Sequence, residues 1–390
     1  MSETTPLVSP AEIPGKGRSL VATEALKAGQ IVLRDSPILV YSAFPVTVDH
    51  YNKERSYCSH CFRSMSNPAS AISCPCCFSA FFCNSNCSSS ALSSSHSPWV
   101  CQALKRLREN ASSLPAEDQQ VQARFLVAAY NLVVISPANF QILMSLQGEH
   151  TNIDTASAFL LHSFISSLSF PNQAQIGFSV ELTAALLAKD KLNAFGFMVP
   201  FAIHKERSVR AYAIYPRASF FNHDCLPNAC RFDYVDSSDE NNTDIIVRII
   251  HDLPQGREIC LSYFPVNLKY SERQCRLKED YGFICNCDRC RVEANWSDEE
   301  DEEDEVIDEV EGEEEDDNNS VDEQMSMNDK ANASAADNDF PHAYFFLRYM
   351  CNRDQCGGTL APLPPSNNKV AVMECNVCGS LSNLDELCDG

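Results

Sequence analysis

The sequence contains no apolar run long enough to cross a membrane, which takes roughly 20 residues in a helix. Residues 1–30 also lack the charged and then apolar layout of a secretion signal. Positive charge is scarce, since the 390 residues include 30 Lys and Arg against 53 Asp and Glu. This balance argues against non-specific binding to nucleic-acid phosphates and favours basic partners. We therefore expect an intracellular protein that binds neither a membrane nor a specific nucleic-acid sequence.

Most of the charge imbalance comes from one segment. Residues 298–317 contain 16 Asp or Glu and no Lys or Arg, and the whole chain has a net charge of −23. Like charges at this density repel each other too strongly to pack, so we expect residues 298–339 to form an acidic disordered linker. The rest of the chain is only mildly acidic, and a hydrophobic content of 44% is enough to fill a core.

The chain has 20 cysteines, and a reducing compartment would keep them from forming disulfides. Residues 58–101 hold four close pairs of potential metal ligands. These are Cys58 and Cys61, Cys74 and Cys77, Cys83 and Cys87, and His96 and Cys101. Zinc takes four thiolate or imidazole ligands in a tetrahedron, so the eight residues suit two zinc ions, most simply in an interleaved arrangement. Because protein ligands fill every position, we expect these ions to be structural.

Two more cysteine groups follow towards the C-terminus. One offers only three ligands, Cys285, Cys287 and Cys290, and needs a fourth from elsewhere in the fold. The other lies in residues 340–390, where the spacing resembles a small zinc ribbon. Its members are Cys351, Cys356, Cys375 and Cys378. We therefore expect three zinc sites, with a fourth at the last group.

Between the cysteine groups, the apolar pattern changes its period. Helical spacing recurs within residues 102–192, which predicts a helical insert. Its strongest segments are residues 124–135, 156–168 and 180–191. Short strand patterns lie on both sides of that insert, at residues 31–33, 38–41, 245–250 and 258–263. A charged helix is expected over residues 271–290. The pattern thus indicates a β-domain interrupted by a metal module and by helices.

The most specific motif is Asn222-His223-Asp224-Cys225-Leu226-Pro227-Asn228. It resembles the N-H-x-C-x-P-N signature of SET-domain lysine methyltransferases. Other motifs of that family occur in the same order as in its members. They are Gly15-Lys16-Gly17-Arg18, Gly256-Arg257-Glu258-Ile259, Leu261-Ser262-Tyr263-Phe264, and the Cys285, Cys287 and Cys290 group of a post-SET segment.

The eight-ligand array resembles a MYND zinc finger. The spacings on both sides of His96 are one residue longer than usual, which leaves His60 as an alternative ligand. Because this array lies inside the SET-like motifs, the chain resembles the SET-and-MYND family over residues 10–292. The helical repeat domain that many members carry at the C-terminus is not apparent.

This resemblance implies an α+β fold. A SET β-fold with a knot-like C-terminal segment would be interrupted by a MYND zinc finger and the helical insert, and followed by a Cys-rich post-SET segment. The implied bounds are 6–50 for the first SET part, 58–101 for the finger, 102–192 for the insert, 193–265 for the SET core and 271–292 for the post-SET segment. The resemblance also implies that Cys225 completes the third zinc site.

The implied activity is methyl transfer from S-adenosylmethionine to a protein lysine. This reaction needs a neutral amine in line with the methyl group and away from water. A lysine with a pKa of about 10.4 is protonated at pH 7, so a narrow apolar channel must favour loss of the proton. By resemblance, Tyr263 and Tyr281 are the catalytic residues that orient the amine. The implied cofactor-binding residues are Lys16, Gly17, Asn193, Asn222, His223, Tyr263 and Phe283.

By the same resemblance, the substrate is a protein with an accessible lysine, with histone tails expected and non-histone proteins as the alternative. The MYND-like module is expected to bind proline-containing peptides. The expected location is the nucleus and chromatin, with the cytoplasm as the alternative. The rival hypothesis is an adaptor, in which the MYND-like module and the acidic linker recruit partners while the SET-like core is inactive.

Overall fold

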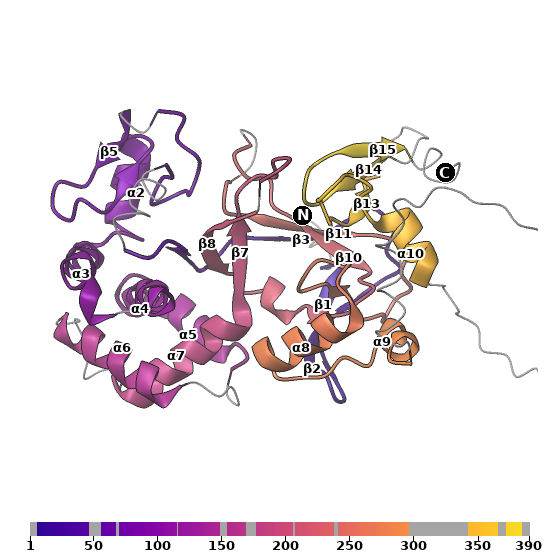
Figure 1. Cartoon of the computed structure of the whole chain (residues 1–390), viewed down its shortest axis with the longest axis horizontal. Helices are drawn as coiled ribbons and strands as arrows, with labels where there is room; N and C mark the ends of the chain where they lie inside the picture. Colours follow the sequence, from indigo (N-terminus) through magenta and orange to yellow (C-terminus); the bar gives the residue numbers. More distant parts are fainter. Residues whose placement is uncertain are drawn as a thin grey trace, which may run out of the picture.

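The computed structural model describes residues 6–46, 56–67, 70–114, 116–148, 154–168, 177–205, 207–237, 241–295, 342–365 and 372–383. Figure 1 shows three parts in a row: a cysteine-rich module beside a helical lobe, a central group of small sheets, and a C-terminal module at the other end. The predicted acidic linker, residues 298–339, lies outside the described residues. Within the described ranges, no helix is both long and apolar enough to span a membrane.

The central part consists of small, mostly antiparallel sheets. One contains β10 (Ala229–Phe232), β11 (Ile245–Ile249) and β3 (Ile31–Asp35), in that order. The second contains β4 (Leu39–Ser42), β8 (Val209–Ile214) and β7 (Ala194–Met198). The third is a hairpin of β1 (Val8–Ile13) and β2 (Gly17–Ala22). Every residue of β11 is buried, because this strand lies in the middle of its sheet and is covered by other elements.

Two very short strands bring distant segments together. β9 (Asn222–His223) pairs in parallel with β12 (Cys260–Leu261), so that Asn222 lies opposite Cys260 and His223 opposite Leu261. A further bond, from the amide of Asp224 to the carbonyl of Leu261, extends the pairing. The predicted strand over residues 258–263 is thus shorter than expected. Its pairing nevertheless places the two most specific sequence motifs side by side.

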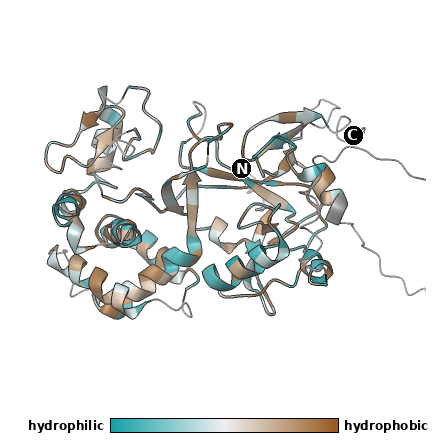
Figure 2. Cartoon of the chain, viewed as in Figure 1, coloured by the Kyte–Doolittle hydropathy of each residue, from teal (hydrophilic) through white to brown (hydrophobic). Residues whose placement is uncertain are grey.

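The helical lobe comprises α3 (Pro98–Glu109), α4 (Glu117–Ile135), α5 (Pro137–Ser145), α6 (Thr155–Ser167) and α7 (Val180–Asn193). Side chains at the N-caps explain where three of these helices begin: the hydroxyls of Ser97 and Ser179 and the carboxylate of Asp154 accept bonds from first-turn amides. Hydrophobic residues run along α6 and α7 and along the central strands (Figure 2). The helical insert is confirmed, although α3 crosses the boundary expected between residues 101 and 102.

The cysteine-rich module contains little regular structure. It has β5 (Ile72–Ser73), β6 (Phe81–Phe82) and α2 (Ser85–Leu92). Its core consists largely of cysteines packed around Ala80, Phe81 and Phe82. So small an apolar core is typical of modules that fold around metal ions.

The predicted helix over residues 271–290 is two helices, α8 (Tyr270–Asp280) and α9 (Asp288–Glu293). α8 ends because Gly282 adopts a left-handed conformation, with φ +78°, and the amide of Phe283 then bonds to the carbonyl of Leu277. This ending turns the chain back, so that the following cysteines approach the central sheets.

The C-terminal module contains α10 (His342–Tyr349), β13 (Leu360–Pro362), β14 (Val372–Cys375) and β15 (Leu381–Asn383). It packs against the sheet of β10, β11 and β3 and shares a hydrophobic core with Phe232 and Ile246. An ion pair joins Arg248 of β11 to Glu374 of β14 at 2.7 Å, and Arg248 is 1% exposed. The module is therefore part of the central body, a packing that the sequence pattern does not predict.

Candidate functional site

Three segments that are far apart in the sequence meet at the carboxylate of Glu258. Lys16 Nζ lies 2.6 Å from Oε2, while the Ser19 hydroxyl donates to Oε1 at 2.8 Å and the Asn222 side-chain amide donates to Oε1 at 3.0 Å. These bonds lower the pKa of Glu258 despite its burial, and the carboxylate raises the pKa of Lys16 despite the partial burial of that ammonium group. Two of the predicted cofactor residues, Lys16 and Asn222, are thus held by one carboxylate.

The tight turn between β1 and β2 places Lys16 next to Gly17. Gly17 has φ +74°, a conformation that favours glycine, and a Cβ atom there would meet nothing within 4 Å. The backbone of this turn therefore lies open beside the Glu258 cluster. Gly17 can contact a ligand only through its backbone.

His223 connects Tyr263 to Cys225. The Tyr263 amide donates to His223 Nδ1 at 3.1 Å, so the ring proton is on Nε2, which lies 3.2 Å from the Cys225 sulfur. Burial lowers the pKa of His223 to about 4, which keeps the imidazole neutral at physiological pH. Both ring nitrogens are used within the protein, so His223 fixes the position of its neighbours.

Aromatic rings gather beside His223. The rings of Tyr263 and Tyr281 are 4.7 Å apart, and the Tyr263 hydroxyl donates to the carbonyl of Phe221 at 2.9 Å. Phe283 lies 6.4 Å from the His223 ring and remains 38% exposed. Burial raises the pKa of both tyrosines, so both hydroxyls stay neutral. The arrangement is a partly open aromatic site whose polar groups have fixed directions.

Asn193 lies at the end of α7, immediately before β7. It is 3% exposed, and its side-chain amide donates to the carbonyls of Gln147 and Lys189 at 2.9 and 2.8 Å. Among the hydrogen bonds of the described segments, none joins Asn193 to the Glu258 cluster. The Asn193 side chain therefore fixes the end of the helix through these two bonds.

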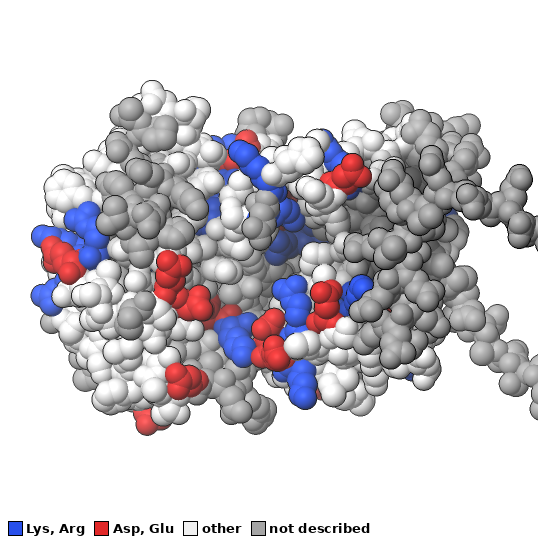
Figure 3. All heavy atoms as spheres, viewed as in Figure 1, with Lys and Arg blue, Asp and Glu red and all other residues white. Residues whose placement is uncertain are grey.

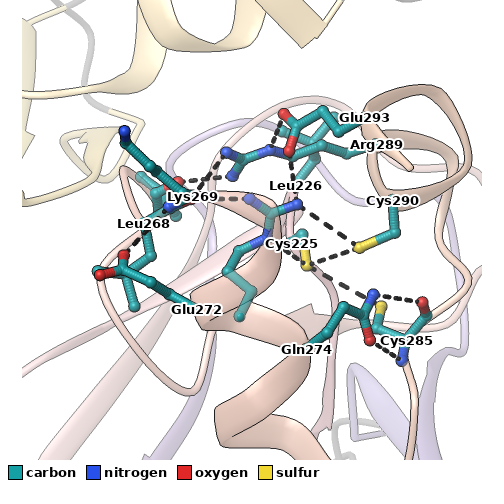
Figure 4. A network of polar contacts seen from close by, with 12 residues as sticks. Cys225, Leu226, Leu268, Lys269, Glu272, Gln274, Cys285, Arg289, Cys290 and Glu293 are labelled. Carbon is teal, nitrogen blue, oxygen red and sulfur yellow. Dashed lines mark hydrogen bonds and ion pairs between the residues drawn. The ribbon is translucent and has the colours of Figure 1, made fainter. Parts of the chain in front are cut away.

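The structure brings Cys225 together with Cys285, Cys287 and Cys290, whose sulfur atoms all lie within 4.8 Å of one another. Arg273, which is fully buried, donates to the sulfur of Cys225 at 3.3 Å and pairs with Glu293 at 2.6 Å. Donation from the other thiols and from Arg273 lowers the pKa of Cys290, which favours the thiolate form. Figure 4 shows Cys225, Cys285 and Cys290 beside Gln274, Arg289 and Glu293 in one polar network.

The eight predicted ligands of the cysteine-rich module form two interleaved groups. Their members are Cys58, Cys61, Cys83 and Cys87, and Cys74, Cys77, His96 and Cys101. Burial lowers the pKa of His96, whose neutral Nε2 lies 3.6 Å from the Cys77 sulfur. His60 instead lies beside the hydroxyl of Ser95, at 3.1 Å. The geometry thus favours His96 over His60 as the imidazole donor.

The C-terminal cysteines form a fourth group. The sulfur atoms of Cys351, Cys356, Cys375 and Cys378 lie within 4.8 Å of one another. Gly358 makes room for this group, because a Cβ atom at that position would lie 2.4 Å from the Cys375 sulfur. Backbone amides of Val377 and Cys378 also point at the Cys375 sulfur, as in zinc knuckles.

The distances within all four groups suit zinc. A tetrahedral ion with Zn–S bonds of about 2.3 Å holds its sulfur ligands about 3.8 Å apart. Sulfur atoms in the four groups are separated by 3.8 Å for Cys61 and Cys83, 3.6 Å for Cys74 and Cys101, 3.9 Å for Cys225 and Cys285, and 3.8 Å for Cys351 and Cys378. The donors are soft thiolates and one imidazole, which is the ligand set that zinc prefers.

Glu258 and Arg273 are site residues that the sequence alone does not indicate. Glu258 lies in the Gly256-Arg257-Glu258-Ile259 motif, but a carboxylate in a motif does not reveal its partners. Arg273 lies on the charged helix and gave no signal, since an Arg at a surface-like helical position is usually solvated. Only the fold shows that it is buried against cysteines.

The pairing of β9 with β12, together with the cysteine group beside Tyr263, defines the class of the protein. The sequence profile of the SET domain matches residues 17–264. The chain therefore belongs to the SET-domain family.

Among relatives, the chain is 52% identical over 393 residues to the histone-lysine N-methyltransferase ASHR2 of Arabidopsis thaliana, covering 96% of this chain and 95% of that protein. It is 26% identical over 307 residues to the N-lysine methyltransferase SMYD2-B of Danio rerio, covering 75% of this chain and 62% of that protein. A solved SET domain of LSMT bound to lysine and AdoHcy is 17% identical, with a TM-score of 0.28. The match covers 74% of this chain and 54% of that chain. A score this low has no bearing on the fold.

Proposed function

We propose that this SET-domain protein is an S-adenosylmethionine-dependent protein-lysine N-methyltransferase that acts on histone lysines, with non-histone proteins as further substrates. The observation that carries the proposal is the aromatic site beside the Glu258 cluster, in which Tyr263 is fixed by both its amide and its hydroxyl. The near full-length similarity to a protein named histone-lysine N-methyltransferase supports the reaction and the substrate class. The cofactor supplies an electrophilic methyl group when it is bound.

In this proposal, the residues of the chain bind and orient the reactants. Lys16 and the backbone at Gly17 and Asn222 would hold the amino-acid end of the cofactor, and Glu258 positions both polar side chains. Tyr263 and Tyr281 would direct the lysine amine, and their neutral rings favour the loss of its proton in an apolar channel. Phe283 would cover the cofactor. Asn193 would contribute through its backbone, since its side chain is engaged elsewhere.

Structural zinc in the four cysteine groups is part of the proposal. The zinc site that contains Cys225 matters most for activity, because the Cys225 sulfur contacts His223, which in turn accepts the amide of Tyr263. The proposed zinc here carries out no chemistry, since four protein ligands complete its coordination. It would hold the chain from Tyr281 to Cys290 against the motif that contains Asn222.

Further partners are proposed for the cysteine-rich module. Ile72 and Phe78 are exposed large hydrophobic residues on its surface, at 41% and 53%, which suits docking of proline-containing peptides. A nuclear location follows from the proposed histone substrate. The adaptor hypothesis shares this docking role, but it does not account for the polar bonds that fix Tyr263.

The direct test is transfer of labelled methyl from S-adenosylmethionine to core histones and to a whole-cell extract. We expect a labelled histone band and a methylated lysine in its mass spectrum. Failure to label either sample, with protein that carries its full complement of zinc, would contradict the proposed reaction and favour the adaptor.

A further inference from the structure

Arg207 lies in the loop between β7 and β8 and is half-buried. Its Nε is shielded from solvent, and among the residues that the structure describes no group accepts a hydrogen bond from it. Burial lowers the pKa of its guanidinium. The negative charge of Asp233 opposes this shift, and the positive charge of Arg231 adds to it. A partly desolvated, unpaired charge is costly, so this position favours an anion from outside.

Two more arginines lie near this loop. Arg231 of β10 pairs with Asp233 at 2.7 Å and donates to the carbonyl of Gly196 at 3.0 Å. Arg353 of the C-terminal module is exposed, and its guanidinium lies 5.4 Å from the centre of the Phe201 ring. Figure 3 shows Lys and Arg atoms gathered in a hollow between the β7 and β8 region and the C-terminal module. We call the site of Arg207, Arg231 and Arg353 the arginine hollow.

The arginine hollow adjoins the aromatic site. Arg231 lies with its guanidinium 5.4 Å from the ring of Phe195, near the start of β7. Its charge also acts on the hydroxyl of Tyr281, whose ring centre lies 4.7 Å from that of Tyr263. The arginine hollow and the aromatic site are therefore neighbours. An extended peptide advances about 3.3 Å per residue, so one strand can reach both.

The C-terminal module completes the hollow. Asn376, which lies between two cysteines of the fourth group, donates to the carbonyl of Arg231 at 3.1 Å. The module also supplies Arg353 itself. Loss of this module would therefore remove one arginine and loosen another.

We propose that the arginine hollow binds an acidic side chain of the protein substrate, a few residues from the target lysine. The proposal rests on the proposed function and narrows its substrate class to lysines with a nearby Asp or Glu. A carboxylate fits because guanidinium groups bind it through two parallel hydrogen bonds. Asp233 is already paired with Arg231 through one of its oxygens, and among the described residues no ion pair engages Arg207 or Arg353.

The test uses the full chain and fluorescent peptides with one central lysine in a Ser and Gly background. For each position beside the lysine, one peptide carries a single Glu and its control peptide carries Gln at the same position. Binding is measured by fluorescence anisotropy in the presence of S-adenosylhomocysteine, and methyl transfer to the same peptides gives KM and kcat. The variants are Arg207→Gln and Arg353→Gln. Arg108→Gln is the matched control, because Arg108 also lies over a ring, that of Phe78, but on the distant α3.

We expect one or two Glu positions to bind about 10-fold more tightly than their Gln matches, as a charge-assisted hydrogen bond allows. Arg207→Gln and Arg353→Gln should remove this preference and raise KM with little change in kcat, while Arg108→Gln should keep it. Equal binding of Glu and Gln peptides by the wild type would overturn the proposal. So would tighter binding of every peptide by the arginine variants, because the hollow would then be occupied by the acidic residues 298–317 of the chain itself.

The two proposals fail in different ways. Absence of methyl transfer to histones and peptides, with the Glu preference intact in binding, would contradict the proposed reaction alone. Methyl transfer without any Glu preference would contradict the arginine hollow alone.

Discussion

The Nε2 atom of His223 lies 3.2 Å from the sulfur of Cys225. This contact links the third cysteine group to the proposed catalytic residue, because the other nitrogen of the same ring accepts the amide of Tyr263. The proposed metal ligand and the proposed catalytic tyrosine are therefore separated by one side chain. Zinc in this group would set the position of Tyr263 without taking part in the reaction.

Replacement of Cys225 by Ser should remove one zinc ion from the protein. The remaining three cysteines cannot close a tetrahedral site, so residues 281–290 should loosen and methyl transfer should fall by about 100-fold as the aromatic site shifts. Metal content is measured by mass spectrometry, and the loosening by hydrogen exchange. Cys275→Ser is the control, since Cys275 is exposed and belongs to none of the four groups. Unchanged zinc content in Cys225→Ser would refute this ligand assignment.

Glu258→Gln tests the polar cluster through its pH dependence. The folded state lowers the pKa of Glu258 below its ordinary value of 4.5, so its stabilisation is present above that pH and is lost as the pH falls through the folded-state pKa. The variant should unfold about 1 kcal/mol more easily at pH 7 and should match the wild type at low pH. Chemical unfolding at each pH measures the difference. A gap that stays constant down to the lowest pH would contradict the ion pair.

Gly358→Ala tests the fourth cysteine group. The added methyl would overlap the Cys375 sulfur and the side chain of Val377, so this site should lose its zinc while the other three keep theirs. The control is Gly196→Ala, where the added methyl would make only ordinary contacts, the closest at 3.5 Å. Three zinc ions in both variants would contradict a metal in this group, and four in both would contradict the predicted clash.

The sequence was most informative where ligands or motif residues are close together. The pairs from Cys58 to Cys101 indicated which residues gather as candidate metal ligands, because the members of each pair are close together in the sequence. Cys225 was placed correctly beside Cys285 only through the family resemblance, since 60 residues separate them. Such long-range partners leave no local pattern.

The rest of the site depends on tertiary contacts that local sequence does not encode. The ion pair of Arg248 with Glu374 joins residues 126 positions apart, so the docking of the C-terminal module could not be foreseen. The single helix expected over residues 271–290 was wrong because a charged pattern hides the left-handed turn at Gly282. The strand predicted over residues 258–263 contains β12, but local sequence does not reveal its pairing with β9, which builds the site.

The catalytic role proposed for Tyr263 is tested by comparing methyl transfer to core histones by the wild type, Tyr263→Phe and Tyr130→Phe, side by side. Each variant loses one tyrosine hydroxyl that makes a hydrogen bond, to the Phe221 carbonyl at Tyr263 and to the Thr183 hydroxyl at Tyr130. We predict that Tyr263→Phe loses about 100-fold in rate with its zinc content and fold intact, whereas Tyr130→Phe keeps its rate. Equal rates for wild type and Tyr263→Phe would contradict the catalytic role of this residue.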